Sequence, residues 1–432
     1  MTTKVKQMNI GVLIYGCGHH QAAWRMPDSS IKRLGDKRYY QSLAQLAERG
    51  LLDAVFFADN QSFPAKTDTA LPAFWFDPIV NLTAISQVTA HIGLVSTISS
   101  TFSNPFTAAR QLLSLDHVTG GRVGWNLVTS MTDLEAQNHS MSALPNHESR
   151  YAKADEFPKV MNQLFTSWHT KAFIHSRDDN QVIHSDMIQP FHHHGTHFNV
   201  KGPSTTPASP QGKPVAMQAG ASPQGIALAT KYAEAIYSVS WNIQQARQFR
   251  QRLDKQLAKN GEKRHIKIFP GLVTYVAKTR EEAMAKKHAL DHALPIETAL
   301  EQLSFFVQQD CFAWDIDDKV PELPPIEDFT GPIGRYETIL TIIRDKDPTV
   351  RELLGYLNAG GGHLTLIGTP EDIVDTMAQW FDEGVADGFN LMPPTLPHSL
   401  EDFIELVVPE QQRRGLYRER YTSQTFRGHL NL

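Results

Sequence analysis

Short apolar runs alternate with helical patterns along most of the chain. Eight of these runs are rich in β-branched and aromatic residues and have the length of buried strands. They cover residues 10–15, 54–58, 92–98, 123–128, 215–218, 235–239, 268–276 and 389–392. Strands that alternate with helices form parallel sheets, and eight of them are typical of a closed (β/α)₈ barrel. The sequence therefore predicts an α/β fold, a TIM barrel with insertions.

Several helices between these runs can be placed directly. Residues 39–49 and 105–117 each carry an apolar face at helical spacing. Thr369 and Pro370 are a helix N-cap and a first-turn proline, so we expect a helix to lead from them into the last strand.

Two connections are longer than simple barrel loops require, at about residues 131–214 and 278–388. We predict that both are insertions in one domain that covers residues 1–432. The second contains three consecutive glycines, Gly360 to Gly362. This run fits a flexible connector better than a phosphate-binding loop.

Polar side chains follow or end several of the predicted strands. Asp59 comes after the second strand, Thr97 lies in the third and Asn126 lies in the fourth. Because the active sites of TIM barrels lie at the C-terminal ends of the strands, these three side chains are candidate site residues.

Two helix starts add further polar groups. Asn146 is a candidate N-cap, and the four-residue spacing of His147 and Tyr151 puts both on one helix face. Ser222 and Pro223 begin another helix, whose backbone N–H groups and serine hydroxyl are suited to a phosphate. Every helix N-cap shares these features, so ordinary caps are the alternative interpretation.

The histidines form two groups with different expectations. Residues 192–197, HHHGTH, could bind zinc, but adjacent histidines in a strand point to opposite faces. A structural role is therefore preferred, and no metal is predicted. His20 and Arg25 lie in the loop GHHQAAWR after the first strand, where imidazole and guanidinium groups suit a substrate with carboxylates. The alternative is a loop that packs Trp24 into the core.

Composition excludes several classes of function. The 432-residue chain has a formal charge of −5, which offers no basic field for nucleic acid or anionic lipid. No apolar run is long enough to cross a membrane. The two cysteines, Cys17 and Cys311, form no metal or disulfide pattern, which favours a reducing cytoplasm. The arginines between residues 413 and 427 are expected in a solvated or subunit-contacting tail.

The sequence contains no visible catalytic side-chain set. It has no Ser–His–Asp order or nucleophile elbow, and no pair of carboxylates at strand ends suits glycoside hydrolysis. No catalytic residue is assigned, and the chemistry is predicted to belong to a bound cofactor.

Seven segments together resemble one family. They are GHHQAAWR, FFADN, TFSNPFTAARQLLSLDHVTGGRVGWNLVTS, RYAKADEF, QAGASPQG, LIGTPEDIVD and VVPEQQRRGLYRERY. In order and spacing they are similar to the flavin-dependent monooxygenases of the nitrilotriacetate and dibenzothiophene-sulfone type, within the bacterial-luciferase-like superfamily. One departure stands out, because His139 and Ser140 occupy positions where this family usually has Phe and Gly. Analogy alone therefore does not assign the substrate.

The resemblance implies a TIM barrel and a two-component chemistry. Reduced FMN would come from a separate NAD(P)H-dependent flavin reductase, and molecular oxygen would oxidise carbon next to nitrogen or sulfur. The positions that match the family's FMN contacts are Asp59, Thr97, His147, Tyr151 and Ser222, with Asn126 a weaker match. Family members pair through the helices after the second and third strands, so a homodimer is expected. Residues 278–388 are the candidate lid.

Two other functions are compatible with the same barrel. A deazaflavin-dependent oxidoreductase would transfer hydride without oxygen, and a flavin-binding protein without catalysis would have the same site residues. Within the monooxygenase interpretation, the GHHQAAWR loop favours an amino- or thio-polycarboxylate substrate over an aromatic sulfone.

Overall fold

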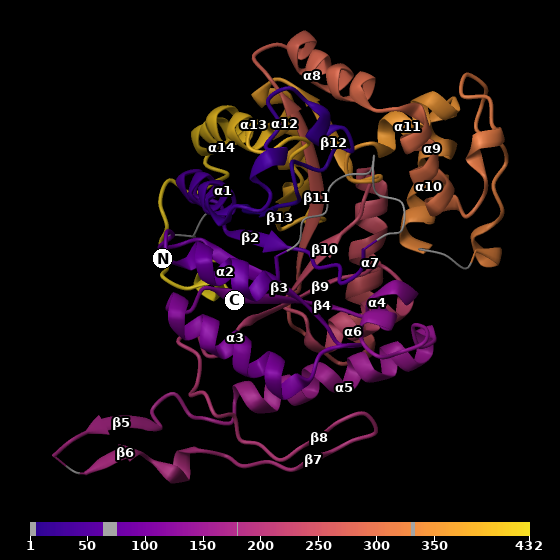
Figure 1. Cartoon of the computed structure of the whole chain (residues 1–432). Coiled ribbons are helices and arrows are strands. Elements are labelled where there is room, and N and C mark those ends of the chain that lie inside the picture. The colour runs from indigo at the N-terminus through magenta and orange to yellow at the C-terminus, as the bar shows by residue number, and fades with distance from the viewer. Residues whose placement is uncertain (1–5, 64–75, 179, 330–332) are drawn as a thin grey trace.

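The computed structural model describes residues 6–63, 76–178, 180–329 and 333–432. Within these ranges, a closed barrel of eight parallel strands lies at the centre of the molecule (Figure 1). Around the barrel the strands are β1 (Asn9–Leu13), β2 (Ala54–Phe57), β3 (Gly93–Ser99), β4 (Val123–Val128), β9 (Val215–Ala219), β10 (Ala235–Ser238), β11 (Lys267–Val276) and β13 (Gly388–Leu391). Pairing of β13 with β1 closes it. These strands match the eight predicted runs, so the TIM-barrel prediction is confirmed.

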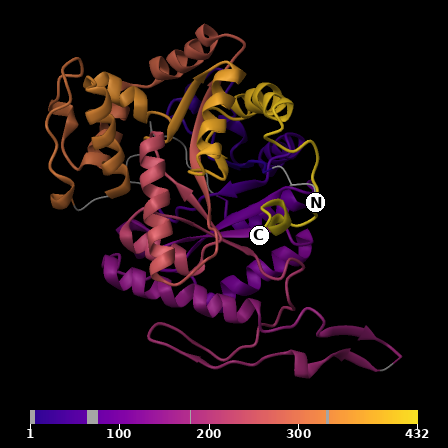
Figure 2. The same ribbon diagram turned by 180° about the vertical axis from the view of Figure 1, so that it is seen from behind.

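The barrel strands are apolar because they are covered on both faces, by helices outside and by side chains inside. All seven residues of β3 are buried, for example. The predicted helices are present as α1 (Lys37–Arg49), α3 (Pro105–Thr119) and α12 (Pro370–Asp382). Thr369 and Asp372 form a capping box at the start of α12, which confirms the predicted N-cap. Further helices on the outside are α2 (Pro78–Ser86), α6 (Pro223–Tyr232) and α7 (Ile243–Lys259) (Figure 2).

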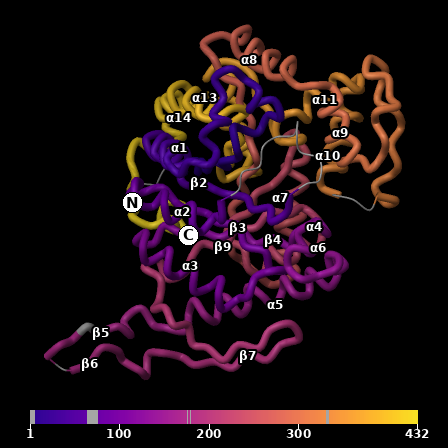
Figure 3. Tube along the Cα trace, in the orientation of Figure 1, coloured from indigo at the N-terminus to yellow at the C-terminus, as the bar shows by residue number. Residues whose placement is uncertain are grey.

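The connection between β4 and β9 carries its own elements. They are α4 (Asp133–Asn138), α5 (His147–Phe165), the strand pair β5 (Phe173–Ser176) and β6 (Gln181–Ile183), and the strand pair β7 (His193–His194) and β8 (Asn199–Val200). The two strand pairs extend beyond α3 and α5, away from the barrel (Figures 1 and 3). In the histidine tract, His193 Nε2 lies 2.8 Å from Glu156 Oε1 on α5. The described residues contain no group of three metal-binding side chains.

The connection between β11 and β13 forms a helical layer beside the barrel. It contains α8 (Arg280–Ala293), α9 (Ile296–Val307), α10 (Ile333–Lys346) and α11 (Val350–Leu357), followed by β12 (Leu364–Gly368) and α12. Leu303, Ile339 and Leu353 belong to a hydrophobic cluster of this layer. The layer contacts α7, where Gln245 Nε2 donates to Thr341 Oγ1 at 3.0 Å.

Strand β12 was not predicted, and it extends the sheet beyond the barrel. It pairs with the C-terminal half of β11, from Leu272 to Val276. The three glycines before it form a turn in which all have positive φ, at 75°, 60° and 89°. The three glycines are therefore explained by a left-handed backbone conformation that only glycine adopts easily. They form a defined turn and not the predicted flexible connector.

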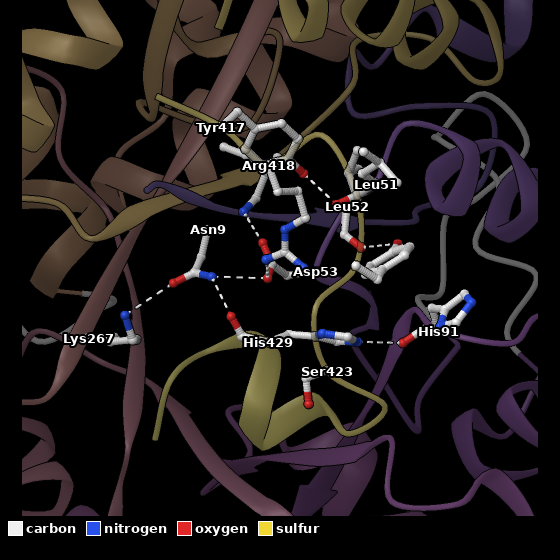
Figure 4. Close-up of polar contacts among 12 residues, drawn as sticks. Asn9, Leu51, Leu52, Asp53, His91, Lys267, Tyr417, Arg418, Ser423 and His429 are labelled. Atoms are coloured by element: carbon white, nitrogen blue, oxygen red, sulfur yellow. Dashed lines mark hydrogen bonds and ion pairs between the residues drawn. The ribbon is translucent and has the colours of Figure 1, made fainter. Parts of the chain in front are cut away.

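The C-terminal segment closes the N-terminal end of the barrel (Figure 4). The Phe426 ring fills the space beneath two strand glycines, since a Cβ on Gly93 or Gly124 would come within 2.3 or 2.7 Å of it. Arg418 pairs with Asp53, and Arg427 pairs with Glu234 at 2.6 Å. The predicted solvated or subunit-contacting tail is therefore wrong for these two arginines. They are internal partners of buried or nearly buried carboxylates.

None of the helices within the described ranges is long and apolar enough to cross a membrane.

Candidate active site

The ends of β3 and β4 bring two predicted residues into contact. Thr97 and Asn126 are register partners in adjacent strands, and both side chains are buried. Thr97 Oγ1 donates to the Phe57 carbonyl at 2.9 Å, and Asn126 Nδ2 donates to Thr97 Oγ1 at 3.3 Å. Asn126 Oδ1 is also buried, but it has no hydrogen-bond partner among the described residues. Leaving such an acceptor unsatisfied costs about 1–3 kcal/mol, which is typical of a group kept for a ligand.

Asp59 accepts a hydrogen bond from a short chain of side chains. The chain ends at His139, one of the two residues that depart from the family pattern. Gln61 Nε2 donates to Asp59 Oδ2 at 2.7 Å, and His139 Nε2 donates to Gln61 Oε1 at 2.5 Å. The His139 ring stacks on Phe102 at a centroid distance of 4.3 Å. Burial raises the pKa of Asp59. His139 thus keeps the aromatic contact that Phe would make and adds a hydrogen bond that orients Gln61.

The starts of α5 and α6 meet at the same end of the barrel. Tyr151 Oη lies 3.4 Å from Ser222 Oγ, although 71 positions separate them in the chain. Ser222 Oγ accepts from the Gly225 N–H at 3.0 Å, and Asn146 caps α5, so both predicted caps are confirmed. The rings of His147 and Tyr151 lie 4.5 Å apart. Burial and the nearby Arg150 charge lower the pKa of His147.

Two cations beside this group lack carboxylate partners. Arg150 donates to the Ser130 carbonyl at 2.5 Å, and Lys153 donates to the Thr101 carbonyl at 2.7 Å. Neither forms an ion pair with a carboxylate in the described ranges. Burial lowers the pKa of both groups. A partly desolvated charge with only neutral acceptors attracts an anion strongly, and phosphate geometry suits Arg well.

The two predicted substrate residues in the loop after β1 have different surroundings. His20 is fully buried, its Nε2 donates to Asp291 Oδ1 at 3.1 Å, and its Nδ1 accepts from the Ala22 N–H at 3.1 Å. Both ring nitrogens are therefore occupied, and the prediction that His20 binds substrate is not supported. His20 instead ties this loop to α8. Arg25 is partly exposed and lies 4.4 Å from the centre of the Trp24 ring, so its predicted role stays a prediction.

Known proteins match nearly all of this chain. The luciferase-like monooxygenase family matches residues 8–387. N-acetyl-S-(2-succino)cysteine monooxygenase of Bacillus subtilis is 38% identical, with 100% of this chain and 98% of that protein covered. Nitrilotriacetate monooxygenase component A of Aminobacter aminovorans is also 38% identical, with 99% and 97% covered. The solved structure of a riboflavin lyase with modified FMN and riboflavin has a TM-score of 0.86, 26% identity and coverages of 99% and 96%.

The chain belongs to the luciferase-like monooxygenase family.

Membership confirms the resemblance found in the sequence and the predicted enzyme class, a flavin-dependent oxidoreductase of the monooxygenase type. Several buried polar atoms were not predicted as site residues. Ser238 Oγ in β10, Asn390 Oδ1 in β13 and His363 Nδ1 beside β11 are buried without a partner among the described residues. Gln61 was missed as well. Nothing in the local sequence marks these side chains, because their surroundings depend on segments that lie far apart in the chain.

Proposed function

We propose that this luciferase-like monooxygenase is the oxygenase component of a two-component system. It would take reduced FMN from a separate NAD(P)H-dependent flavin reductase and use molecular oxygen to oxidise a small organic substrate at carbon next to nitrogen or sulfur. The observation that carries the proposal is the group formed by Tyr151, Ser222 and the uncompensated Arg150 at one side of the barrel mouth. The name "component A" of one relative supports a reductase partner.

The residues present fit the cofactor. Ser222 with the α6 N-terminus and Tyr151 would hold the phosphate, with Arg150 supplying positive charge. Asn126 Oδ1 would accept a hydrogen bond from a ring N–H, which satisfies a buried acceptor, and Thr97 lies beside it. Asp59 and His147 complete the predicted contacts. Bound reduced flavin supplies the activation of oxygen, and the related riboflavin lyase structure contains a modified FMN.

The role of this chain's own side chains is to bind, orient and exclude water. Thr97 and Asn126 are buried at the strand ends, so this part of the mouth is suited to shield a reactive group from solvent. We propose that the chain works as one barrel domain and that its insertion at about 278–388 acts as the lid. The insertion at about 131–214 supplies α5 and with it Tyr151.

The substrate that fits best is an amino- or thio-polycarboxylate. Both relatives at 38% identity are named for substrates of this kind, and the rim carries basic side chains such as Arg25. A cytoplasmic location is proposed because two free, buried cysteines suit a reducing compartment.

The decisive experiment supplies chemically reduced FMN to the purified protein and follows oxygen uptake and products by mass spectrometry. Nitrilotriacetate and N-acetyl-S-(2-succino)cysteine would be compared with dimethyl sulfide, which has no carboxylate. We expect oxidised product in proportion to oxygen consumed with a polycarboxylate. Hydride transfer from reduced deazaflavin without oxygen would support the oxidoreductase alternative. Flavin binding without turnover of any compound would support a non-catalytic flavoprotein.

A homodimer through α2 and α3 is also proposed. A surface groove between these helices is lined by Ile79, Phe106, Leu115 and Val118, and Val80 and Val118 are 65% and 58% exposed. Two exposed valines beside this groove are the observation that supports the proposed contact surface. The variant Val118→Asp should shift the protein from dimer to monomer in light scattering, whereas Val182→Asp, on β6 and 62% exposed, should not. A wild-type protein that is monomeric at micromolar concentration would contradict the proposal.

A further inference from the structure

A second basic group lies at the barrel rim, apart from the Tyr151–Ser222 group. It is built from Arg335 in α10, His363 just before β12 and His19 in the loop after β1. The glycine turn at residues 360–362 lies directly before His363 in the chain, and it contacts Arg335. Arg335 donates from one nitrogen to the Gly360 and Gly361 carbonyls at 2.7 and 2.5 Å, and a Cβ on Gly360 would lie 3.6 Å from His363 Cδ2.

His363 is a buried imidazole whose Nδ1 has no hydrogen-bond partner among the described residues. Its side chain is among the buried polar groups, at 8% exposure, and Nδ1 contacts no donor or acceptor in the described ranges. The ring lies directly on the backbone of β11, because a Cβ on Gly271 would come within 2.2 Å of Nδ1. Gly271 therefore creates the space that the imidazole occupies. A buried polar ring left unsatisfied is destabilising, so stability alone does not explain this arrangement.

Arg335 is the charged member of the group. The side chain keeps some exposure, but protein surrounds the guanidinium, and burial lowers its pKa to about 10. It is therefore still a cation at neutral pH. Burial lowers the pKa of His19 to about 4 and that of His363 well below its usual range, and the Arg335 charge lowers both further. The two imidazoles are neutral neighbours of one positive charge.

No described carboxylate neutralises Arg335. The carboxylate of Asp291, on α8 in the same helical layer, is already bonded to His20, Lys287 and Asn358. The acceptors of Arg335 are backbone carbonyls, and only one of its terminal nitrogens donates to them. The planar guanidinium thus keeps donors that match a carboxylate in geometry and charge.

We propose that Arg335 and His363, with His19 beside them, form a subsite for one carboxylate of the substrate. Arg335 supplies the charge, and the uncharged His363 and His19 rings lie beside it. The inference rests on the proposed function, and it names the residues that select an anionic substrate. The flavin phosphate is the other anion within reach, since Gly334 approaches Ala221 in the turn before α6. The experiment therefore measures both ligands.

The test uses Arg335→Met, His363→Phe and the control Arg344→Met, which removes an exposed arginine from the same helix. Binding of N-acetyl-S-(2-succino)cysteine and of its fully methylated ester is measured by calorimetry, and binding of reduced FMN is measured anaerobically by fluorescence. This probe is preferred to nitrilotriacetate because nitrilotriacetate also chelates metal ions. In Arg335→Met we expect the Kd of the acid to rise about thirtyfold or more, since one partner of a partly desolvated charge pair is lost. His363→Phe should raise it less.

Ester affinity and reduced-FMN affinity should stay within about twofold in every variant. A parallel loss of FMN affinity in Arg335→Met would overturn the proposal in favour of a phosphate contact. Equal binding of the acid by wild type and both rim variants, or no binding by wild type, would also overturn it. If Arg335→Met does not fold, Arg335→Lys carries the same expectation with a smaller rise, because lysine keeps the charge without the planar fork. Arginine-dependent acid binding without oxygen-coupled turnover would retain the subsite and reject the oxygenase function.

Discussion

The two ends of the barrel treat charge in opposite ways. At the N-terminal end, buried carboxylates are paired. Asp53 accepts from Asn9 Nδ2 at 3.0 Å and the Ile10 N–H at 2.6 Å, and it pairs with Arg418 (Figure 4). Asp387 accepts from Arg250 at 2.8 Å.

At the C-terminal end, the basic groups lack such partners. Arg150, Lys153 and Arg335 donate to backbone carbonyls and form no ion pair with a carboxylate in the described ranges. Carboxylates at the closed end are therefore paired within the fold, whereas these three cations at the open end have only backbone carbonyls as acceptors among the described residues. We propose that stability depends mainly on charges at the closed end and ligand binding on charges at the open end, so changes at each end should affect different measurements.

The largest effect is expected from Asp53→Asn at the closed end. The variant leaves Arg418, whose side chain is only 11% exposed, without its carboxylate. Breaking a buried pair in this way costs about 3–5 kcal/mol of unfolding free energy. Denaturant titration measures this loss, and Asp317→Asn, in an exposed pair with Arg351, should change little. Reduced-FMN affinity should not change in the folded protein. A selective loss of that affinity would break the proposed separation.

Acid titration should separate the two ends by pH. Burial lowers the pKa of His19 to about 4, so the fold favours its neutral form. The stabilisation is complete above the unfolded pKa of about 6.5 and is lost as pH falls to about 4, on the order of 3 kcal/mol. For Asp387, burial alone would raise the pKa, but His265 and Arg250 lower it to about 2. Its contribution is lost only between about pH 4 and 2.

The variants His19→Asn and Asp387→Asn test this order. Unfolding free energy is measured by urea titration at a series of pH values. His19→Asn should flatten the slope between about pH 6.5 and 4, and Asp387→Asn should flatten it below about pH 4. Identical slopes in wild type and His19→Asn would contradict a neutral, buried His19.

Ser222→Ala and Tyr151→Phe should weaken reduced-FMN binding by about 1–3 kcal/mol each, because each removes a group from the proposed phosphate contact. Ser222→Ala also loses a helix cap, so Thr279→Ala, at the N-cap of α8, is its control for cap loss alone. Fluorescence titration measures the affinities. Unchanged affinity in both variants would place the phosphate elsewhere.

The smallest effect is expected from Ser140→Gly at the rim. Ser140 is exposed and has φ of 63°, a left-handed conformation that is unfavourable for a residue with a Cβ. Glycine should raise the unfolding free energy by up to about 1 kcal/mol, after its own entropy is subtracted. Thermal unfolding measures the gain, and Ser140→Ala should show none. A loss of stability in Ser140→Gly would mean that the hydroxyl has a structural role.

Local sequence patterns were sufficient to predict the barrel and the helix caps at Asn146 and Ser222. Strand runs and caps such as Ser222 are local signals, because apolar periodicity and N-cap chemistry depend on neighbours a few residues away. The family resemblance also placed Tyr151 and Ser222 among five expected FMN-contacting positions before their contact was visible.

The hydrogen-bond partners of buried polar groups could not be predicted from local patterns. His20 was predicted at the mouth but is occupied by Asp291, 271 positions away in the chain. Arg418 was predicted in a solvated or subunit-contacting tail, but it pairs with Asp53 at the N-terminal end of the barrel. No local sequence pattern marks His363. Its ring lies on β11, where Gly271 leaves the space that the imidazole occupies. Partnering of buried charges and rings depends on closure of the barrel, which joins segments that no local pattern connects.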